Sequence, residues 1–469
     1  MPIPHTSAGG TNEVVVLGAG LCGLFGAYML ARNGIAVTIL EQQAIPGGLA
    51  SSVWHDGNAY ELGVHHLHGR DKGVLDQVST LLGNQLLGVE KHALLRFGDA
   101  FRHYPLQFRD LLFGLKPLTL AGMLAGYLGQ QVKNRFKHKE PQDAEEALIY
   151  LYGGPLYRMF FRDFTERYWD MPVTELSAGF VWQKMPRLRA VDVLLRLLAP
   201  LGFRPDRQTH ADTAVAKERV YYTRRGMALL VDSLCSEISR LGGRIVCSAR
   251  PLEVNPSGAA GCTVAYSQGS QTQHLACAAC LSTIPLGSLV RLLPGVPDAV
   301  RTSAANLRYK AIAVYGLLVK RERLLPAQYV YFRKRLFHRL AEPKQCGLAV
   351  EPAGHSLLLC EMTCTPGDKR WRGDETVKEH VLADVEAEGI LKRQDVCSVH
   401  HRTARYAYPL FLKGYERHLC RIQDYIAPLS NLIATGRQGA FCFANMHRTM
   451  RLGWEAADKL AQTVRNHAG

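Results

Sequence analysis

The sequence contains no run of about 18 uncharged apolar residues, so we expect no membrane-spanning helix. Paired cysteines are nearly absent as well: the twelve cysteines are scattered singly, apart from Cys277 and Cys280. That pair has no second pair at the spacing of a zinc site, so we expect buried thiols and no metal centre. Unpaired thiols fit a reducing, cytoplasmic setting.

A nucleic-acid-binding motif is also absent, although 56 lysines and arginines against 41 acidic residues give a net charge of +15. The basic residues are dispersed along the chain rather than clustered as in a nucleic-acid-binding protein. We therefore expect no nucleic-acid partner and a surface suited to anionic ligands or anionic lipid. Residues 1–11 contain glycine, proline and serine without an apolar segment, and we expect them to form a flexible tail.

The start of the sequence does contain an alternation of strand, helix and strand. The apolar run 14–17 predicts a buried strand, and an apolar helix follows as far as Arg32. Asn33 and Gly34 end that helix, and a second apolar strand covers 35–40. This order predicts the βαβ unit of a parallel, Rossmann-type sheet.

Three glycines between the first strand and the helix have the spacing of a dinucleotide-binding turn. Gly18 permits the tight turn, Gly20 lets a pyrophosphate approach the helix N-terminus, and Gly23 lets the helix pack closely against the sheet. Glu41 ends the second strand, where a carboxylate accepts hydrogen bonds from a ribose. We therefore expect these four residues to bind a dinucleotide. The alternative is a glycine-rich turn that binds nothing.

A glycine pair, Gly47 and Gly48, follows Glu41 after a short gap. The pair resembles the second fingerprint of the flavin amine oxidase superfamily, in which the glycines approach FAD. An arginine often accompanies them in that superfamily, and this chain has none there. The resemblance implies that the cofactor is FAD rather than NAD and that both glycines contact it. An ordinary glycine turn is the alternative.

Three histidines fall within residues 65–68. They have no acidic or sulfur partner at metal-ligand spacing, so we expect polar contacts and no metal. The loop resembles that of the UDP-galactopyranose mutase branch of the superfamily, which lies against the isoalloxazine ring. This resemblance implies that His65 and His68 lie beside the flavin as catalytic residues. Val64 and Gly69 depart from the pattern of that branch.

An aromatic run over 152–169 and the turn at 171–177 form a second region of resemblance. They are similar to a helix and turn found in mutase-like and protoporphyrinogen-oxidase-like flavoproteins. Most of these aromatic side chains are expected in the core. Arg102 and Tyr104, which precede the aromatic run, and Arg158 within it are candidates to orient a small substrate. The two arginines would suit an anionic one. For each arginine a structural ion pair is the alternative.

Residues 115–140 combine an apolar helix over 118–128 with a basic end at 133–139. A basic amphipathic segment of this kind can lie on a membrane surface. A solvated helix end has the same pattern, because runs of charge usually face water. We therefore expect at most a peripheral contact with membranes.

Near the C-terminus, a strand ends in Gly436 and Arg437, and Asn445 and Met446 precede a helix over 448–464. This segment resembles the part of the superfamily that holds the FAD pyrophosphate and the flavin edge. The resemblance implies that these four residues bind the cofactor. A strand, turn and helix without a ligand would have a similar local pattern.

The resemblance covers nearly the whole chain and implies an α/β fold. A discontinuous Rossmann-type FAD-binding domain is expected over 12–75, 215–290 and 425–469. An inserted α+β substrate domain is expected over 76–214 and 291–424.

The same resemblance implies an FAD-dependent oxidoreductase of the amine oxidase type, which removes a hydride from a small organic substrate. The alternative is a UDP-galactopyranose mutase-like isomerase that uses reduced FAD on a sugar nucleotide. Phe441 is a candidate substrate residue that bears on this choice, because mutases have a tyrosine there that contacts the substrate phosphate. Phenylalanine lacks that hydroxyl, which favours the oxidoreductase. The sequence does not indicate an oligomeric state.

Overall fold

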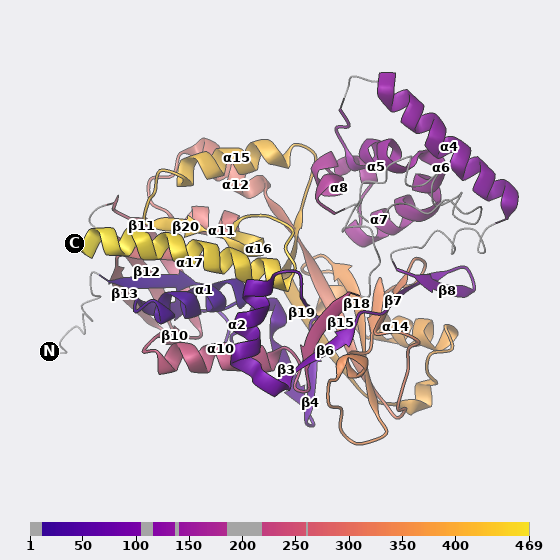
Figure 1. The fold of residues 1–469 in the computed structure, drawn as a ribbon, viewed down its shortest axis with the longest axis horizontal. Coiled ribbons are helices and arrows are strands. Elements are labelled where there is room, and N and C mark those ends of the chain that lie inside the picture. Colours follow the sequence, from indigo (N-terminus) through magenta and orange to yellow (C-terminus); the bar gives the residue numbers. More distant parts are fainter. Residues whose placement is uncertain (1–11, 105–115, 137–139, 185–217, 259–260, 469) are drawn as a thin grey trace.

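The computed structural model describes residues 12–104, 116–136, 140–184, 218–258 and 261–468. It contains a unit built on a parallel sheet, a unit built on a large mixed sheet, and a group of helices that projects beyond the mixed sheet (Figure 1). Within the described ranges, no helix combines the length and apolar character needed to cross a bilayer.

The parallel sheet has five strands taken from three distant parts of the chain. In spatial order these are β10 (Arg244–Val246), β2 (Ala36–Leu40), β1 (Glu13–Leu17), β14 (Ala279–Ser282) and β20 (Leu432–Ala434). All four pairings are parallel. The predicted βαβ unit is therefore present, and its first strand lies at the centre of the sheet. The three parts fall within the segments expected for the FAD-binding domain, although the domain bounds themselves stay a prediction.

The two faces of this sheet are covered differently. Val14 and Val16 belong to the core formed with helices α1 (Leu21–Arg32), α10 (Ala228–Arg240) and α17 (Met446–Ala468). Val15 and Leu17 point to the other face, as alternation along a strand requires. There they join the core of an antiparallel sheet made of β11 (Ala249–Pro256), β12 (Cys262–Gln268) and β13 (Gln271–Cys277). Both faces of β1 are thus buried, and all five of its residues are enclosed.

The mixed sheet has seven strands and forms the second unit. Its order is β19 (Val396–Leu410), β15 (Arg308–Val319), β18 (Ser356–Cys364), β17 (Arg339–Ala341), β16 (Tyr329–Phe332), β7 (Ala93–Phe97) and β8 (Ala100–His103). Helix α14 (Glu375–Ala387) packs on it through a separate apolar core. These seven strands fall within the segments expected for the substrate domain, whose bounds stay a prediction.

Further shorter elements accompany the two sheet units. They comprise the hairpin β3 (Ser52–His55) and β4 (Asn58–Glu61), the small sheet of β5 (Leu67–His68), β9 (Arg219–Thr223) and β6 (Leu86–Glu90), and the helices α2 (Lys72–Leu82), α11 (Leu286–Leu292), α12 (Asp298–Asn306), α13 (Lys369–Arg372), α15 (Tyr415–Ile426) and α16 (Gly436–Gly439).

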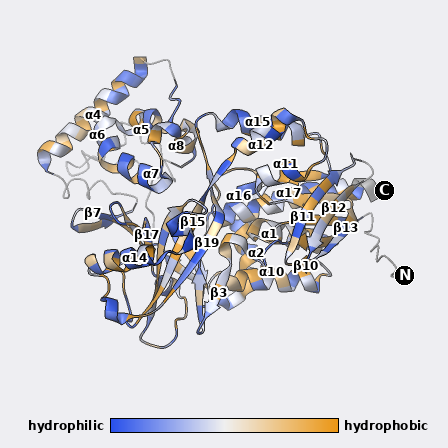
Figure 2. Ribbon diagram, turned by 180° about the vertical axis from the view of Figure 1, so that it is seen from behind, coloured by the Kyte–Doolittle hydropathy of each residue, from blue (hydrophilic) through white to orange (hydrophobic). Residues whose placement is uncertain are grey.

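The projecting helices are α4 (Pro117–Phe136), α5 (Ala144–Tyr152), α6 (Gly154–Leu156), α7 (Arg162–Trp169) and α8 (Ala178–Lys184). The aromatic run does not form one continuous α-helix, because Tyr157–Phe161 adopt a π-helical turn between α6 and α7. Arg167 ties α7 to the mixed sheet by donating to the carbonyl oxygens of Phe332 and Phe337. Colouring by hydropathy shows apolar residues in both sheet units, whereas α4 carries apolar and polar residues along its length (Figure 2).

Helices α1 and α17 cross at a pair of glycines. A Cβ on Gly26 would lie 3.0 Å from the carbonyl oxygen of Gly453, and a Cβ on Gly453 would lie 2.2 Å from the carbonyl oxygen of Cys22. The backbones of the two helices therefore touch, which brings the N-terminal end of α17 toward the start of α1.

We expect Gly453→Ala to destabilise the protein, because its Cβ would overlap the Cys22 carbonyl oxygen. The helices would have to separate, and overpacking of this kind costs about 1–3 kcal/mol. The matched control is Gly122→Ala on α4, where no atom lies within 4 Å of the added Cβ. Thermal unfolding should show a lower midpoint for Gly453→Ala and an unchanged or higher one for Gly122→Ala. Equal midpoints would contradict the close crossing.

Candidate functional site

The carboxyl ends of the parallel strands converge at the turn between β1 and α1. Gly18 has a φ of +96°, a conformation that favours glycine. Its N–H donates to the carbonyl oxygen of Leu40 at 2.8 Å, which joins the turn to the end of β2. Thr283, just after β14, donates its hydroxyl to the carbonyl oxygen of Leu17 at 2.9 Å. Three strand ends thus fix one turn, which is where ligands bind in sheets of this type.

Gly20 and Gly23 have different surroundings within that turn. A Cβ on Gly23 would lie 2.0 Å from the carbonyl oxygen of Gly18, so close packing of the helix requires glycine there. A Cβ on Gly20 would have no atom within 4 Å. Gly20 is also the residue at the N-terminal end of α1, where no side chain caps the helix and no acidic residue lies in the first turn. Space and free N–H groups therefore coincide at Gly20.

The glycine pair packs against the same turn. The N–H of Gly47 donates to the carbonyl oxygen of Ala19 at 2.7 Å, and Gly47 forms a parallel bridge with Gly20. A Cβ on Gly48 would lie 3.2 Å from the Cα of Gly20. The two glycine motifs thus form one cradle.

Glu41 lies at the end of β2, 9% exposed, beside this cradle. Its two carboxylate oxygens accept hydrogen bonds from the N–H groups of Ala19 and Gln43, each at 2.8 Å. A carboxylate oxygen has two lone pairs, so each retains capacity for a further donor such as a ribose hydroxyl.

His65 is half-buried and its Nδ1 lies 3.0 Å from the carbonyl oxygen of Gly63. Burial lowers the pKa of His65 to about 4, and the charges of Arg339 and Arg437 act in the same direction. The side chain is therefore neutral at physiological pH. Because a carbonyl oxygen only accepts, we assign the proton to Nδ1, which leaves Nε2 as an acceptor.

His68 makes a different contact, with a carboxylate. Its Nδ1 lies 2.9 Å from Oε1 of Glu218, which also accepts from Arg70 at 2.7 Å and, through Oε2, from Lys91 at 2.9 Å. The hydrogen bond with His68, and those from Lys91 and Arg70, hold the pKa of Glu218 well below its ordinary value despite partial burial. Glu218 is thus a carboxylate that orients the imidazole of His68.

The first turn of α17 meets this histidine. The ring of His447 lies 5.5 Å from that of His68 in an edge-to-face arrangement, and its Nδ1 is buried without a hydrogen-bond partner. Of the two predicted residues before it, Asn445 is exposed and Met446 is 8% exposed. The carbonyl oxygen of Asn445 accepts from the N–H of Thr449 at 2.8 Å, which starts the helix.

Arg437 is a half-buried cation in the turn after β20, with its Nε enclosed. Its guanidinium lies 4.8 Å from the ring centre of Tyr408 and 5.1 Å from that of Phe443. Its Nε has no hydrogen-bond partner, and no carboxylate in the described part of the chain pairs with it. Burial lowers its pKa. Gly436 precedes it with a φ of +81°, and a Cβ there would lie 2.7 Å from Cys22 Sγ on α1.

The candidate substrate residues lie on different elements of the fold. Arg158 is exposed in the π-helical turn, and Arg102 lies on β8 with its Nε buried and unpaired. Tyr104 is 46% exposed, and its ring centre lies 4.3 Å from that of Tyr331.

Phe441 is 1% exposed and packs against the rings of Tyr309, Phe411 and Tyr415, at centroid distances of 5.2 to 5.7 Å. Its φ of +48° is strained for a residue other than glycine. The side chain serves the core in this arrangement, which gives a physical reason for its apolar character that does not involve substrate.

Sequence reasoning missed three residues at the site. Glu218 and His447 converge on His68, as described above. Arg402 on β19 donates to the carbonyl oxygen and hydroxyl of Ser51 at 3.0 and 3.1 Å, which joins the mixed sheet to the segment after the glycine pair. No local pattern marks these residues, because each pairs with a partner far away in the chain.

The cradle fits an anionic dinucleotide. The open space at Gly20, the uncapped start of α1 and the unpaired cation of Arg437 all suit phosphate or another anion. Within the described ranges, no group of three or more metal-ligating side chains is present.

Comparison with known proteins agrees with this arrangement. The sequence profile of the family described as flavin containing amine oxidoreductase matches residues 21–461. The chain belongs to this family. The resemblance to the flavin amine oxidase superfamily is thus confirmed, and the cofactor is FAD.

Curated relatives cover the chain unevenly. Hydroxyneurosporene desaturase from Rubrivivax gelatinosus is 37% identical over 94 residues, 20% of this chain and 17% of the relative. All-trans-retinol 13,14-reductase from Rattus norvegicus is 23% identical over 361 residues, 68% of this chain and 56% of the relative. The chain therefore matches less than two thirds of the length of either relative.

Solved structures match over nearly the whole chain. A reduced UDP-galactopyranose mutase has a TM-score of 0.79 at 19% identity, covering 97% of this chain and 96% of that one. A protoporphyrinogen oxidase described as putative, from Exiguobacterium sp. 255-15, has a TM-score of 0.71 at 15% identity, covering 97% and 100%. At these identities the likeness shows the fold, and the expected α/β fold is confirmed.

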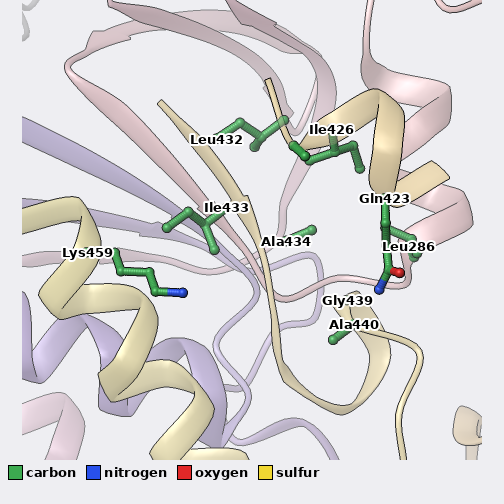
Figure 3. A pocket seen from close by; sticks show the side chains of 10 residues that line it. Leu286, Gln423, Ile426, Leu432, Ile433, Ala434, Gly439, Ala440 and Lys459 are labelled. Atoms are coloured by element: carbon green, nitrogen blue, oxygen red, sulfur yellow. The ribbon is translucent and has the colours of Figure 1, made fainter. Parts of the chain in front are cut away.

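A separate cavity of about 320 Å³ lies beside β20 (Figure 3). It is lined by Leu286, Gln423, Ile426, Ala427, Leu432, Ile433, Ala434, Gly439, Ala440 and Lys459. None of these is a predicted site residue, and most are apolar. The cavity is therefore not the centre of the candidate chemistry.

We expect Gly20→Ala to reduce FAD binding without destabilising the fold, because the added Cβ projects into open space. A methyl group there would hold the pyrophosphate away from the N–H groups of α1, and the Kd for FAD should rise about tenfold or more. Flavin content and the midpoint of thermal unfolding of the apoprotein measure the two effects. Gly122→Ala, with equal space, should change neither. Full FAD affinity in Gly20→Ala would place the pyrophosphate elsewhere.

The lowered pKa of buried His66 predicts that the folded protein loses stability in acid. Burial, together with the charge of His68, lowers its pKa to about 3, below the ordinary value of 6.5. The unfolded chain therefore binds a proton that the folded chain does not, so stability is complete above pH 6.5 and falls as the pH drops toward 3. The contribution reaches about 1.4 kcal/mol per pH unit.

Replacing this histidine tests that dependence. His66→Gln should flatten the fall in the free energy of unfolding between pH 6.5 and 4.5 relative to the unmodified protein. His274→Gln, at an exposed position on β13, is the control and should leave the slope unchanged. Parallel pH dependences of the His66 variant and the unmodified protein would show that His66 is protonated normally in the folded state.

Proposed function

We propose that this protein is an FAD-dependent oxidoreductase that removes a hydride from a small organic substrate. The observation that carries the proposal is the match of residues 21–461 to the flavin containing amine oxidoreductases. The names of the relatives, a desaturase and a reductase, support redox chemistry. Bound FAD would supply the acceptor for the hydride.

His65 and His68 are proposed to act beside the flavin in different ways. Neutral His65 offers Nε2 as a hydrogen-bond acceptor, because its Nδ1 faces the Gly63 carbonyl oxygen. His68 is held by Glu218 with a proton on Nδ1, so its Nε2 can take a proton and share the resulting charge with the carboxylate. The pair of side chains thus combines a fixed acceptor with a proton carrier.

The described site residues form one dinucleotide cradle, in which Gly20 and the pair Gly47 and Gly48 converge. We propose that electrons accepted from the substrate pass on to oxygen or to another acceptor, soluble or membrane-borne. A small anionic substrate is proposed, because the cation of Arg437 has no carboxylate partner among the described residues and lies close to the rings of Tyr408 and Phe443.

A mutase is the second candidate, and one observation favours it. The reduced UDP-galactopyranose mutase has a TM-score of 0.79 with nearly complete coverage of both chains. In the sequence, the missing hydroxyl of Phe441 favoured the oxidoreductase over the mutase. In the structure Phe441 is enclosed in an aromatic core, so the missing hydroxyl does not decide between the two reactions.

A reducing, cytoplasmic location is proposed on the cysteines. All twelve are free thiols; seven are buried, three are half-buried, and Cys397 and Cys420 are exposed. Exposed thiols persist in a reducing compartment.

Redox activity and isomerisation differ in their use of the flavin. We expect oxidised enzyme, mixed anaerobically with its substrate, to lose the absorption of oxidised flavin, and aerobic turnover to produce hydrogen peroxide or reduce an added acceptor. A panel of amines, polyenes and sugar nucleotides would be screened in this way. Activity only after dithionite reduction, with interconversion of sugar ring forms and no acceptor consumed, would replace the proposal with the mutase.

A further inference from the structure

Helix α4 has an apolar outer face. Leu118, Val132 and Phe136 are 87%, 58% and 76% exposed, and Leu128 beside them is 37% exposed. Residues 118, 125, 132 and 136 are spaced by seven, seven and four, so they lie along one side of the helix. Ala125 in this stripe is exposed as well. We call these five residues the outer face of α4.

The opposite side of α4 already has a partner within the protein. Met123 and Tyr127 are 4% and 2% exposed. Between them Gly126 lies so close to α6 that a Cβ there would be 2.6 Å from Pro155. The helix is therefore anchored by one apolar side and presents a second apolar side to solvent, a pattern that marks an interaction surface.

The charges next to the outer face have one sign. The helix contains no aspartate or glutamate, while Lys133 and Arg135 lie in its last turn and Lys116 precedes its first residue. All three cations are exposed. The whole chain carries a net charge of +15, so the field around the protein also attracts anions.

The position of α4 makes the outer face accessible. The helix is at the periphery of the projecting group, far from the parallel-sheet unit, in the views from both sides (Figures 1 and 2). No described helix can span a bilayer, so contact with lipid would be made along a surface.

We propose that the outer face of α4 docks on the surface of an anionic lipid bilayer. The apolar stripe lies among the acyl chains near the head groups, and Lys116, Lys133 and Arg135 meet lipid phosphates or other anionic head groups. Charge complementarity favours this occupant over a second copy of the chain, because two such faces would bring the same cations together. The inference is independent of the chemistry proposed for the flavin site.

Vesicle binding by the full-length holoprotein tests the proposal. Sedimentation with vesicles of phosphatidylcholine and phosphatidylglycerol should capture the protein, and pure phosphatidylcholine should capture severalfold less. Raising the salt from 0.1 to 0.5 M should weaken binding severalfold, because the contact with head groups is screened. Absence of binding to the anionic vesicles would overturn the proposal.

Variants locate the contact on α4. Val132→Ser combined with Phe136→Ser should reduce the bound fraction about tenfold, and Lys133→Gln with Arg135→Gln should remove the preference for anionic lipid. Leu252→Ser on β11 is the matched control, because Leu252 is 42% exposed on the parallel-sheet unit and should leave binding unchanged. Flavin content and thermal unfolding should be equal in all variants, since the altered side chains are exposed.

Phe136→Trp adds a readout of depth. Its fluorescence should shift to the blue on anionic vesicles and be quenched by brominated acyl chains, whereas Leu252→Trp should not respond. Sedimentation velocity tests whether a second copy of the chain covers the face instead. If the protein is a dimer that does not bind vesicles, and if the Val132 and Phe136 variant is a monomer, the face would be assigned to a second copy. Vesicle binding that survives every change on α4 would move the contact to another surface.

Discussion

The cofactor cradle depends on one steric constraint, the contact between the start of α1 and the turn before it. The Gly18 carbonyl oxygen lies 2.0 Å from the position of a Cβ on residue 23, so any other residue would push the helix away from the strand ends. With the helix seated, its N–H groups face the open space at Gly20. The crossing of Gly26 and Gly453 then adds α17, and the first turn of α17 brings His447 to His68.

Local pattern explains why this part of the fold was predictable from the sequence. The strand at 14–17, the helix ending at Arg32 and the strand over 35–40 appear where the sequence placed them, within a residue or so. Each is specified by neighbours in the sequence, namely the apolar runs and the glycine that ends the helix. The spacing of Gly18, Gly20 and Gly23 makes the prediction more specific, because few functions other than dinucleotide binding require glycine at all three positions.

Long-range pairing explains what the sequence did not reveal. The carboxylate that holds His68 comes from Glu218, which lies 150 residues away. The π-helical turn at Tyr157–Phe161 interrupts an aromatic run whose composition would suit a plain α-helix. Phe441 was interpreted through a resemblance, yet its neighbours Tyr309 and Phe411 belong to other parts of the chain. Such contacts depend on the tertiary fold, which no window of sequence contains.

The order of strands in the parallel sheet also constrains how the protein is made. Val14 at the centre of the sheet lies opposite Ala279, and the next strand outward, β20, begins at Leu432. A ribosome releases the glycine turn first and the strands and helix that complete its surroundings last. The nascent chain therefore carries a largely apolar β1 without its neighbour β14 until residues 279–282 have been synthesised, and such exposed strands are prone to aggregation. The complete surroundings of the glycine turn therefore form only after the segment with β20 and α17 has been synthesised.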